Sequence, residues 1–188
     1  TNIIIWSIAN ETPQSPARLE FLTRLANKAR SLDNVRLVSA ALEKEGVKPG
    51  VMTVNDKLSS LFDIISFNQY VGWYDGLPEK CDRINWTFSE EKPVIISEFG
   101  ADCVYGLRGS KTDRFTEDYQ EDLYIRSVNM FKRIPALAGT TPWILKDFRS
   151  PRRQLPGIQD DFNRKGVVSD KGQKKKAFYV MQNWYNEM

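Results

Sequence analysis

Two glutamates stand where strongly apolar segments end, and carboxylates can act as acids, bases and nucleophiles. Glu11 closes the run Asn2-Ile-Ile-Ile-Trp-Ser-Ile-Ala-Asn10, and Glu98 closes Pro93-Val-Ile-Ile-Ser. In a barrel of parallel strands, side chains at the carboxyl ends of buried strands meet at the catalytic face. Two carboxyl groups that share one cleft can cleave a glycosidic bond. The pattern therefore predicts a glycosidase, and its plain alternative is a pair of solvated strand-end residues.

The composition removes several other kinds of chemistry. The chain contains no histidine, which excludes Ser-His-Asp and Cys-His nucleophiles and imidazole-bound metals within it. Acid–base work then falls to carboxylates, tyrosine or lysine. Cys81 and Cys103 do not fit a metal-binding spacing, so we expect two free thiols and no metal or cofactor. Free thiols are only a weak indication of a reducing compartment.

Charge and hydropathy indicate an ordinary globular domain. The 188 residues are 41% hydrophobic, and 27 basic side chains nearly balance 24 acidic ones. This balance gives no reason to expect nucleic acid or a membrane surface as a partner, and no apolar run approaches the roughly 20 residues of a membrane span. The chain opens at Thr1 directly into an apolar run, without a signal peptide. We therefore expect that upstream sequence is missing, and the compartment stays undetermined.

Short apolar segments alternate with amphipathic ones, which predicts an α/β fold with a parallel sheet. We expect strands at residues 3–8, 35–40, 63–68, 93–97 and 139–145, and helices at 16–32, 78–88, 116–133 and 172–186. Residues 43–56 and 146–165 are expected to form loops, and the second is long enough to suggest a function. The run Lys174-Lys175-Lys176 is expected to be a solvated helix face. Five strands fall three short of a closed eight-stranded barrel.

Several segments, taken in order, resemble the C-terminal half of the catalytic barrel of glycoside hydrolase family 2, and within it the β-glucuronidases. Residues 6–11 (Trp-Ser-Ile-Ala-Asn-Glu) resemble the family's acid/base segment, and residues 96–101 (Ile-Ser-Glu-Phe-Gly-Ala) its nucleophile segment. Residues 67–74 and the stretch from Trp143 to Phe148 are similar to the sixth- and eighth-strand segments. The resemblance covers nearly the whole chain. It implies strands 4–8 of a (β/α)8 TIM barrel, with residues 1–188 as a partial catalytic domain that lacks strands one to three and two upstream β-domains.

The resemblance also implies roles for individual residues. Glu98 would be the nucleophile, Glu11 the acid/base, and Tyr70 the donor that orients the nucleophile. Asn10 would bind the sugar 2-hydroxyl, and Trp143 would form the floor of the sugar site. Tyr70 and Trp143 have core packing as their plain alternative. No metal or cofactor is implied, the partner is a carbohydrate, and family members often form homo-oligomers.

The motif Asn163-Arg-Lys165-Gly resembles the Asn-x-Lys motif with which β-glucuronidases hold the sugar carboxylate. An amide donor and an ammonium together suit a buried carboxylate, and this gain is lost when the sugar carries CH2OH. The plain alternative is a polar turn. Tyr74 is expected near the same carboxylate. The loop that precedes this motif contains three arginines, Arg149, Arg152 and Arg153. They either contribute to an anion-binding entrance of the site or are solvated, and we assign Arg149 to the site.

The chain departs from the family pattern in a longer, more basic loop at residues 149–156 and in Val71, where an aromatic is common. The leading hypothesis is retaining hydrolysis of terminal β-D-glucuronosides. The alternatives are a β-galactosidase or β-galacturonidase of the same family, a barrel hydrolase of another clan, and a non-catalytic carbohydrate-binding protein or inactive fragment. With five of eight strands, we expect activity only together with the missing N-terminal part.

Overall fold

The computed structural model describes residues 2–188, which form two compact units. The first unit contains the residues up to Gln69 together with Ile84–Ser97 and Ile134–Thr140. The second unit contains Tyr70–Arg83, Glu98–Arg133 and Thr141–Met188. Each unit has its own packing and is described separately below.

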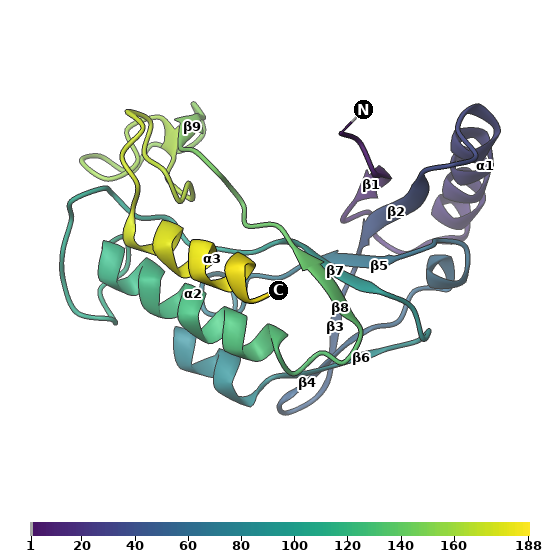
Figure 1. Cartoon of the computed structure of the whole chain (residues 1–188), viewed down its shortest axis with the longest axis horizontal. Coiled ribbons are helices and arrows are strands. Elements are labelled where there is room, and N and C mark those ends of the chain that lie inside the picture. Colours follow the sequence, from purple (N-terminus) through teal and green to yellow (C-terminus); the bar gives the residue numbers. More distant parts are fainter. Residues whose placement is uncertain (1) are drawn as a thin grey trace. The chain divides into compact units, whose positions relative to one another are not determined.

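The first unit is built on a five-stranded sheet with the strand order β1-β2-β5-β7-β8 (Figure 1). The strands are β1 Ile5–Asn10, β2 Leu37–Leu42, β5 Ile65–Asn68, β7 Val94–Glu98 and β8 Leu137–Thr140. The pairs β1/β2, β2/β5 and β7/β8 are parallel. Each strand overlaps the range predicted from the sequence, so the predicted parallel sheet is confirmed. In the described part of the chain, β1 and β8 are its two edges and the sheet stays open.

Helix α1, Pro16–Leu32, begins and ends where the sequence predicts. The Ser15 hydroxyl accepts a hydrogen bond from the Arg18 backbone N–H at 3.1 Å, which satisfies one of the free donors of the first turn. Pro16 takes the first helical position, where its missing N–H costs nothing. Leu22 and Ala26 are buried against the rest of the unit.

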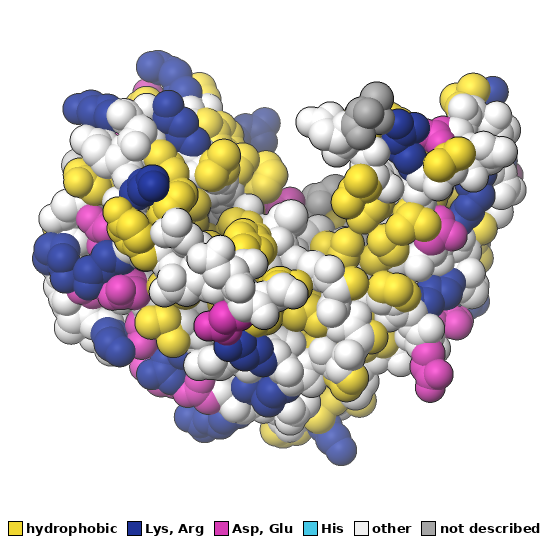
Figure 2. Space-filling model, viewed as in Figure 1, with side chains coloured by type: hydrophobic (Ala, Val, Ile, Leu, Met, Phe, Trp, Pro, Cys, Tyr) yellow, Lys and Arg dark blue, Asp and Glu magenta, His cyan; other side chains and the backbone are white. Residues whose placement is uncertain are grey.

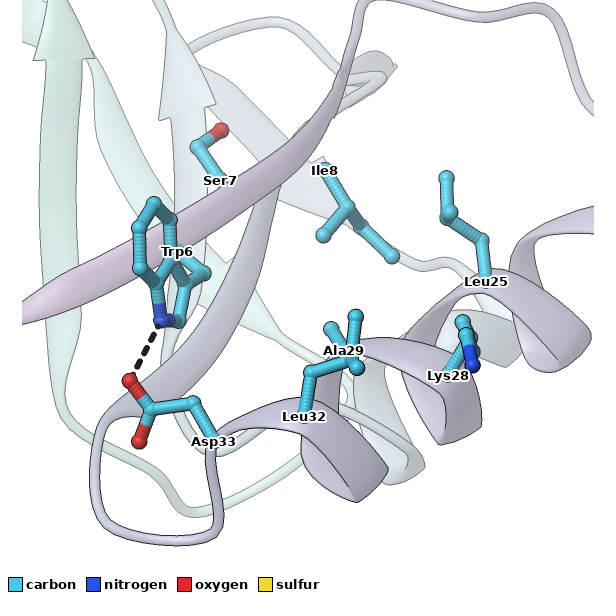
Figure 3. A pocket seen from close by; sticks show the side chains of 8 residues that line it. All are labelled: Trp6, Ser7, Ile8, Leu25, Lys28, Ala29, Leu32 and Asp33. Atoms are coloured by element: carbon cyan, nitrogen blue, oxygen red, sulfur yellow. Dashed lines mark hydrogen bonds between the residues drawn. The ribbon is translucent and has the colours of Figure 1, made fainter.

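An apolar groove lies between β1 and α1 (Figure 3). Ile8 of β1 faces Leu25 and Ala29 of α1 across it. At one end of the groove the Trp6 indole N–H donates to the Asp33 carboxylate at 3.0 Å. This hydrogen bond, followed by those from Arg36, holds the pKa of the Asp33 carboxyl well below its usual range. Figure 2 shows hydrophobic side chains exposed over this region, and the exposed apolar residues here are Ile3, Ile4, Trp6, Leu32, Val35 and Leu37.

A second, three-stranded sheet corrects two predictions. Strands β3 Glu45–Lys48 and β4 Val51–Val54 form an antiparallel hairpin where the sequence predicts a loop, and β4 pairs in parallel with β6 Asn85–Phe88. The helix predicted at residues 78–88 is wrong. Only a 3-10 helix, η2 Pro78–Arg83, is present, and β6 follows it. The Trp86 ring packs 4.6 Å from that of Phe67 in β5, a tertiary contact that favours the extended conformation over the local helical pattern.

The second unit is mainly helical. Helix α2, Glu117–Phe131, is capped by Thr116, whose hydroxyl accepts from the Tyr119 N–H at 3.1 Å. It packs against η2 and against α3, Lys176–Glu187 (Figure 1). The predicted loop at residues 146–165 contains a short antiparallel pair, β9 Phe148–Arg149 with β10 Phe162–Asn163. Of the helices described in residues 2–188, none combines the length and apolar character needed to cross a membrane.

The prediction that Lys174-Lys175-Lys176 forms a solvated helix face is wrong. Lys175 precedes α3 in extended conformation and is completely buried. Its ammonium donates to the Cys103 carbonyl at 2.7 Å, the Asp147 carboxylate at 2.8 Å and the Arg164 carbonyl at 2.9 Å. Lys176 donates to two acidic side chains of α2, Asp118 and Glu121. Acceptors from distant segments, which the sequence alone does not reveal, allow the Lys175 charge to be buried, whereas Lys176 stays partly exposed and Lys174 is exposed.

Both cysteines are free thiols inside the second unit, as the sequence predicts. Burial raises the pKa of Cys81 to about 11 and that of Cys103 to about 12. The Cys103 thiol donates to the Gln120 side-chain carbonyl at 3.0 Å. A buried thiol with a raised pKa contributes very little reactive thiolate near neutral pH.

We therefore expect iodoacetamide to leave Cys81 and Cys103 unmodified in the folded protein at pH 8. Peptide mass spectrometry of labelled samples measures this directly. Labelling in guanidinium chloride, where both thiols become accessible, serves as the control. Rapid modification of either cysteine under native conditions would contradict the burial described for it.

Candidate active site

Glu98 is the last residue of β7, and its carboxylate accepts a hydrogen bond from the Tyr70 hydroxyl at 2.7 Å. Tyr70 comes two residues after β5, and both side chains belong to the second unit. Burial, and then the hydrogen bond to Glu98, raise the pKa of the Tyr70 phenol far above its usual value. The phenol therefore keeps its proton and acts as a donor. The structure thus brings together the predicted nucleophile and the residue predicted to orient it.

The backbone after Glu98 is fixed by close packing. Phe99 is fully buried, with its ring 5.2 Å from that of Tyr124 and 4.9 Å from that of Phe131. Gly100 has φ +143°, and a Cβ there would come within 2.8 Å of the Tyr124 hydroxyl. Only glycine fits this position, because the side chains of other residues rarely adopt this φ and would clash. The Glu-Phe-Gly sequence therefore has a packing reason as well as a chemical one.

Trp143 lies in the same unit, beyond the end of β8 rather than inside the predicted strand. Its backbone N–H donates to the Phe99 carbonyl at 2.9 Å, which ties it to the segment that carries Glu98. The Trp143–Ile144 peptide bond is cis. The indole is half-buried and meets the Phe148 ring edge-on at 6.1 Å, so it is not a core residue.

Asn10 is the last residue of β1 in the first unit, Glu11 directly follows the strand, and both residues are exposed. Glu11 has φ +47°, in the left-handed region that residues other than glycine rarely adopt, and its N–H donates to the Ala41 carbonyl at 3.0 Å. The Asn10 side-chain carbonyl accepts from the Asn68 amide at 3.0 Å, and the Ser97 hydroxyl donates to Asn68 at 2.8 Å. Hydrogen bonds between the side chains of Asn10, Asn68 and Ser97 thus link the carboxyl ends of β1, β5 and β7. The sequence places Asn68 at the end of a predicted strand, but it does not indicate that Asn68 links Asn10 to Ser97.

Glu11 and Glu98 belong to different compact units, and each has been placed within its own. Glu98 is held by Tyr70 within the second unit, and Glu11 by its backbone hydrogen bond to Ala41 within the first.

Lys165 is buried in the second unit, and its ammonium donates to the Asp102 carboxylate at 3.0 Å. The Gln159 side-chain amide donates to the other oxygen of Asp102 at 2.7 Å. Asn163, at the end of β10, accepts a hydrogen bond from the Lys165 backbone N–H at 3.1 Å with its side-chain carbonyl. The Asn-x-Lys motif is therefore a tight turn whose ammonium is directed at Asp102. The sequence analysis did not include Asp102 or Gln159 among the site residues, although Asp102 comes only four residues after Glu98.

Tyr74 lies beside this ammonium. The Lys165 Nζ is 5.1 Å from the centre of the Tyr74 ring, and the Arg153 guanidinium donates to the Tyr74 hydroxyl in a long hydrogen bond of 3.4 Å. Burial by itself raises the pKa of the Tyr74 phenol, but Lys165 and then Arg153 outweigh burial and hold that pKa below its ordinary value. Two cationic groups therefore converge on one tyrosine.

The three arginines of the loop differ in their surroundings. Figure 2 shows lysine and arginine side chains gathered over the part of the second unit that Figure 1 labels β9. Arg149 is mostly exposed and forms an ion pair with Asp161 at 3.9 Å. Arg152 is exposed, and the structure describes no side-chain contact for it. Arg153 is the one that contacts Tyr74, so the assignment of Arg149 to the site receives no support from its described contacts.

The chain was also compared with known proteins. The family model described as "Glycosyl hydrolases family 2, TIM barrel domain" matches residues 1–188. A β-glucuronidase of Paenibacillus borealis is 31% identical, and the match covers 100% of this chain and 31% of that protein. A β-glucuronidase of Streptococcus agalactiae is 26% identical, with 94% and 30% covered. The chain thus spans about a third of the length of these relatives.

Solved structures give the same picture. A β-glucuronidase of an uncultured Clostridium superposes with a TM-score of 0.76 at 25% identity, covering 97% of this chain and 32% of that one. A family 2 β-galacturonidase from Eisenbergiella tayi, bound to galacturonate, superposes with a TM-score of 0.78 at 22% identity, covering 98% and 33%, which is evidence for the fold alone. Because the family model matches along the whole chain, this protein belongs to the TIM barrel domain family of the family 2 glycosyl hydrolases.

Proposed function

We propose that this chain carries the catalytic carboxylates of a retaining glycosidase that hydrolyses terminal β-D-glucuronosides. The observation that carries the proposal is the convergence of the Lys165 ammonium and the Arg153 guanidinium on Tyr74, in the same compact unit as the Tyr70–Glu98 hydrogen bond. The first supplies a site for a sugar carboxylate, and the second a prepared nucleophile. The names of the relatives agree with this substrate class.

In the proposed reaction Glu98 attacks the anomeric carbon while Glu11 protonates the departing glycosidic oxygen. This forms a covalent glycosyl–enzyme ester and releases the aglycone alcohol. Glu11 then removes a proton from water, which attacks the same carbon and frees Glu98. The anomeric configuration is retained because two inversions occur in sequence. Such a mechanism needs the two carboxyl groups roughly 5–5.5 Å apart.

Tyr70 fits the role of a positioning residue in this scheme. Its hydrogen bond engages the Oε2 atom of Glu98 and so fixes the rotation of the carboxylate. Because the phenol stays protonated, it stabilises the charged, reactive form of Glu98.

Asn10 and Trp143 would contact the sugar ring. The Asn10 side-chain carbonyl is engaged by Asn68, so its amide N–H groups are the ones directed at the sugar 2-hydroxyl. That contact strengthens as positive charge develops on the sugar. The half-buried indole of Trp143 offers an apolar face on which a pyranose ring can stack.

Asn163 and Lys165 would hold the C6 carboxylate. A hydrogen bond from the Lys165 ammonium would be charge-assisted with a carboxylate and not with CH2OH, and it would place the carboxylate beside Tyr74 and Arg153. A galacturonoside carries the same carboxylate, so we include it as the second candidate substrate. The cationic group does not by itself distinguish these two sugars, which differ at C4.

Catalysis by this site is proposed to require a complete eight-stranded barrel. The described sheet has five strands and two open edges, whereas a family member closes eight. The apolar groove between β1 and α1 is the surface against which a neighbouring βα unit of that barrel would pack. The variants below are therefore to be made in the protein that carries this chain together with the remaining strands.

Replacing Tyr70 by phenylalanine removes the hydrogen bond to Glu98 and leaves the ring in place. A hydrogen bond to a charged group is worth about 1.5–3 kcal/mol, so we expect kcat to fall roughly ten- to 150-fold. KM should change little, because Tyr70 acts through Glu98. Steady-state kinetics with nitrophenyl glucuronide measure both constants, and an unchanged kcat would contradict this role.

The two glutamates should respond differently to removal. Glu98→Gly should abolish hydrolysis of all substrates, and added azide should restore product formation as a glycosyl azide of inverted configuration. Glu11→Ala should slow substrates with poor leaving groups far more than dinitrophenyl glycosides, whose aglycone needs no proton. Proton NMR of the products and a leaving-group series measure these effects. A leaving-group dependence that Glu11→Ala leaves unchanged would contradict its role as the acid.

Lys165→Ala should lower kcat/KM for nitrophenyl glucuronide far more than for nitrophenyl galactoside. Removing one partner of a buried ion pair also destabilises the fold by about 3–5 kcal/mol. The ratio of the two rates on one preparation cancels that loss. Lys171→Ala, an exposed lysine of the same unit, is the matched control. A wild-type protein that prefers the galactoside would refute the proposed carboxylate site.

A further inference from the structure

The buried charges at the Asn-x-Lys turn cancel one another. The side chains of Lys165 and Asp102 are each only 1% exposed and lie 3.0 Å apart. Gln159 donates to the second oxygen of Asp102, which holds the carboxylate in place. A neutral pair of this kind attracts an incoming carboxylate only weakly. A buried anion needs a net positive charge beside it, because desolvation otherwise outweighs the attraction.

Arg153 is placed to supply the missing charge. Its backbone N–H donates to the Ser150 carbonyl at 2.9 Å, and its carbonyl accepts from the Asp161 N–H at 2.8 Å, so the loop anchors it on both sides. Its side chain is half-buried and contacts the Tyr74 hydroxyl. Within residues 2–188 the structure describes no ion pair for Arg153, in contrast to Arg149.

Resting on the proposed function, we propose that Arg153 is the specificity-determining cation of the uronate site and that Asp102 is the counter-ion that positions Lys165. Together the three groups carry a net charge of +1, which matches one sugar carboxylate. Tyr74 lies between the two cations and would donate its hydroxyl to the same carboxylate. Arg153 comes from the long basic loop at 149–156 and is not part of the Asn-x-Lys motif.

The chemistry of the two cations differs in a useful way. A buried lysine ammonium held by Asp102 offers its remaining N–H groups from a fixed point. A guanidinium presents a planar fork that can bind both oxygens of a carboxylate. Lys165 would therefore fix the position of the carboxylate, while Arg153 supplies most of the discrimination between a uronate and a neutral sugar.

The test compares Arg153→Gln with Arg152→Gln, the exposed neighbour, in the protein that carries this chain with its remaining strands. The measured quantity is the ratio of kcat/KM for nitrophenyl glucuronide to kcat/KM for nitrophenyl galactoside. We expect Arg153→Gln to lower this ratio by about tenfold or more, the effect of losing a charge-assisted hydrogen bond. Arg152→Gln should leave it unchanged. Arg153→Lys, which keeps the charge but not the fork, should fall between wild type and Arg153→Gln.

A double variant separates charge balance from a structural effect. Arg153→Gln reduces the net charge of the three groups to zero, and adding Asp102→Asn restores it to +1. We therefore expect the Arg153→Gln/Asp102→Asn protein to regain part of the lost ratio. If Arg153→Gln acted only by disturbing the loop, the substitution Asp102→Asn would not restore the lost ratio.

The outcomes distinguish this inference from the proposed function. If the wild-type protein hydrolyses the glucuronide through Glu98 but Arg153→Gln keeps the wild-type ratio, the inference is overturned and the proposed function stands. An Arg153→Gln loss that Asp102→Asn deepens instead of restoring would overturn the assignment of Asp102 as counter-ion. A wild-type protein that hydrolyses neither sugar would overturn both proposals.

Discussion

The arrangement of the second unit depends on one buried ammonium. Lys175 joins the segment after β7, through the Cys103 carbonyl, to Asp147 beyond β8 and to Arg164 within the Asn-x-Lys turn. Burying a lysine charge costs several kcal/mol unless its hydrogen bonds are satisfied, and here three acceptors from three segments satisfy it. Desolvation raises the pKa of the Asp147 carboxyl, although the Lys175 ammonium opposes this. The Lys175 side chain thereby joins the segments that carry Glu98, Trp143 and Lys165, in addition to the hydrogen bonds from Trp143 to Phe99 and from Lys165 to Asp102.

A second constraint acts on the segment that carries Glu98. Gly100 leaves no room for a side chain, and Phe99 is enclosed by Tyr124 and Phe131, so the backbone beyond Glu98 has little freedom. The carboxylate itself is then fixed by a tyrosine that does not lose its proton. Rigid packing of this kind prepares a charged group in advance, which is how an active site stabilises charge without reorganisation during the reaction.

The residues proposed for catalysis and those proposed for specificity lie on different kinds of structure. Glu98 ends β7 and Glu11 directly follows β1, so the sheet determines where both carboxylates lie. The cationic group around Tyr74 is built from loops at residues 102, 153, 159 and 163–165. Loops vary more readily than strands, so under the proposed function the accepted sugar could change between relatives while the strand-end carboxylates stay the same.

The sequence by itself determined the parallel sheet and the bounds of α1, because periodicity and caps are local properties. Its motifs indicated the family, and the resemblance to that family implied the pairing of Tyr70 with Glu98. Only the tertiary structure decided that residues 85–88 form a strand, since packing of Trp86 on Phe67 overrides the local pattern. It also decided that Lys175 is buried and that Arg153, rather than Arg149, lies beside Tyr74. The sequence does not show whether a charged side chain is solvated or paired with a distant carboxylate, because that partner is brought near only when the chain folds.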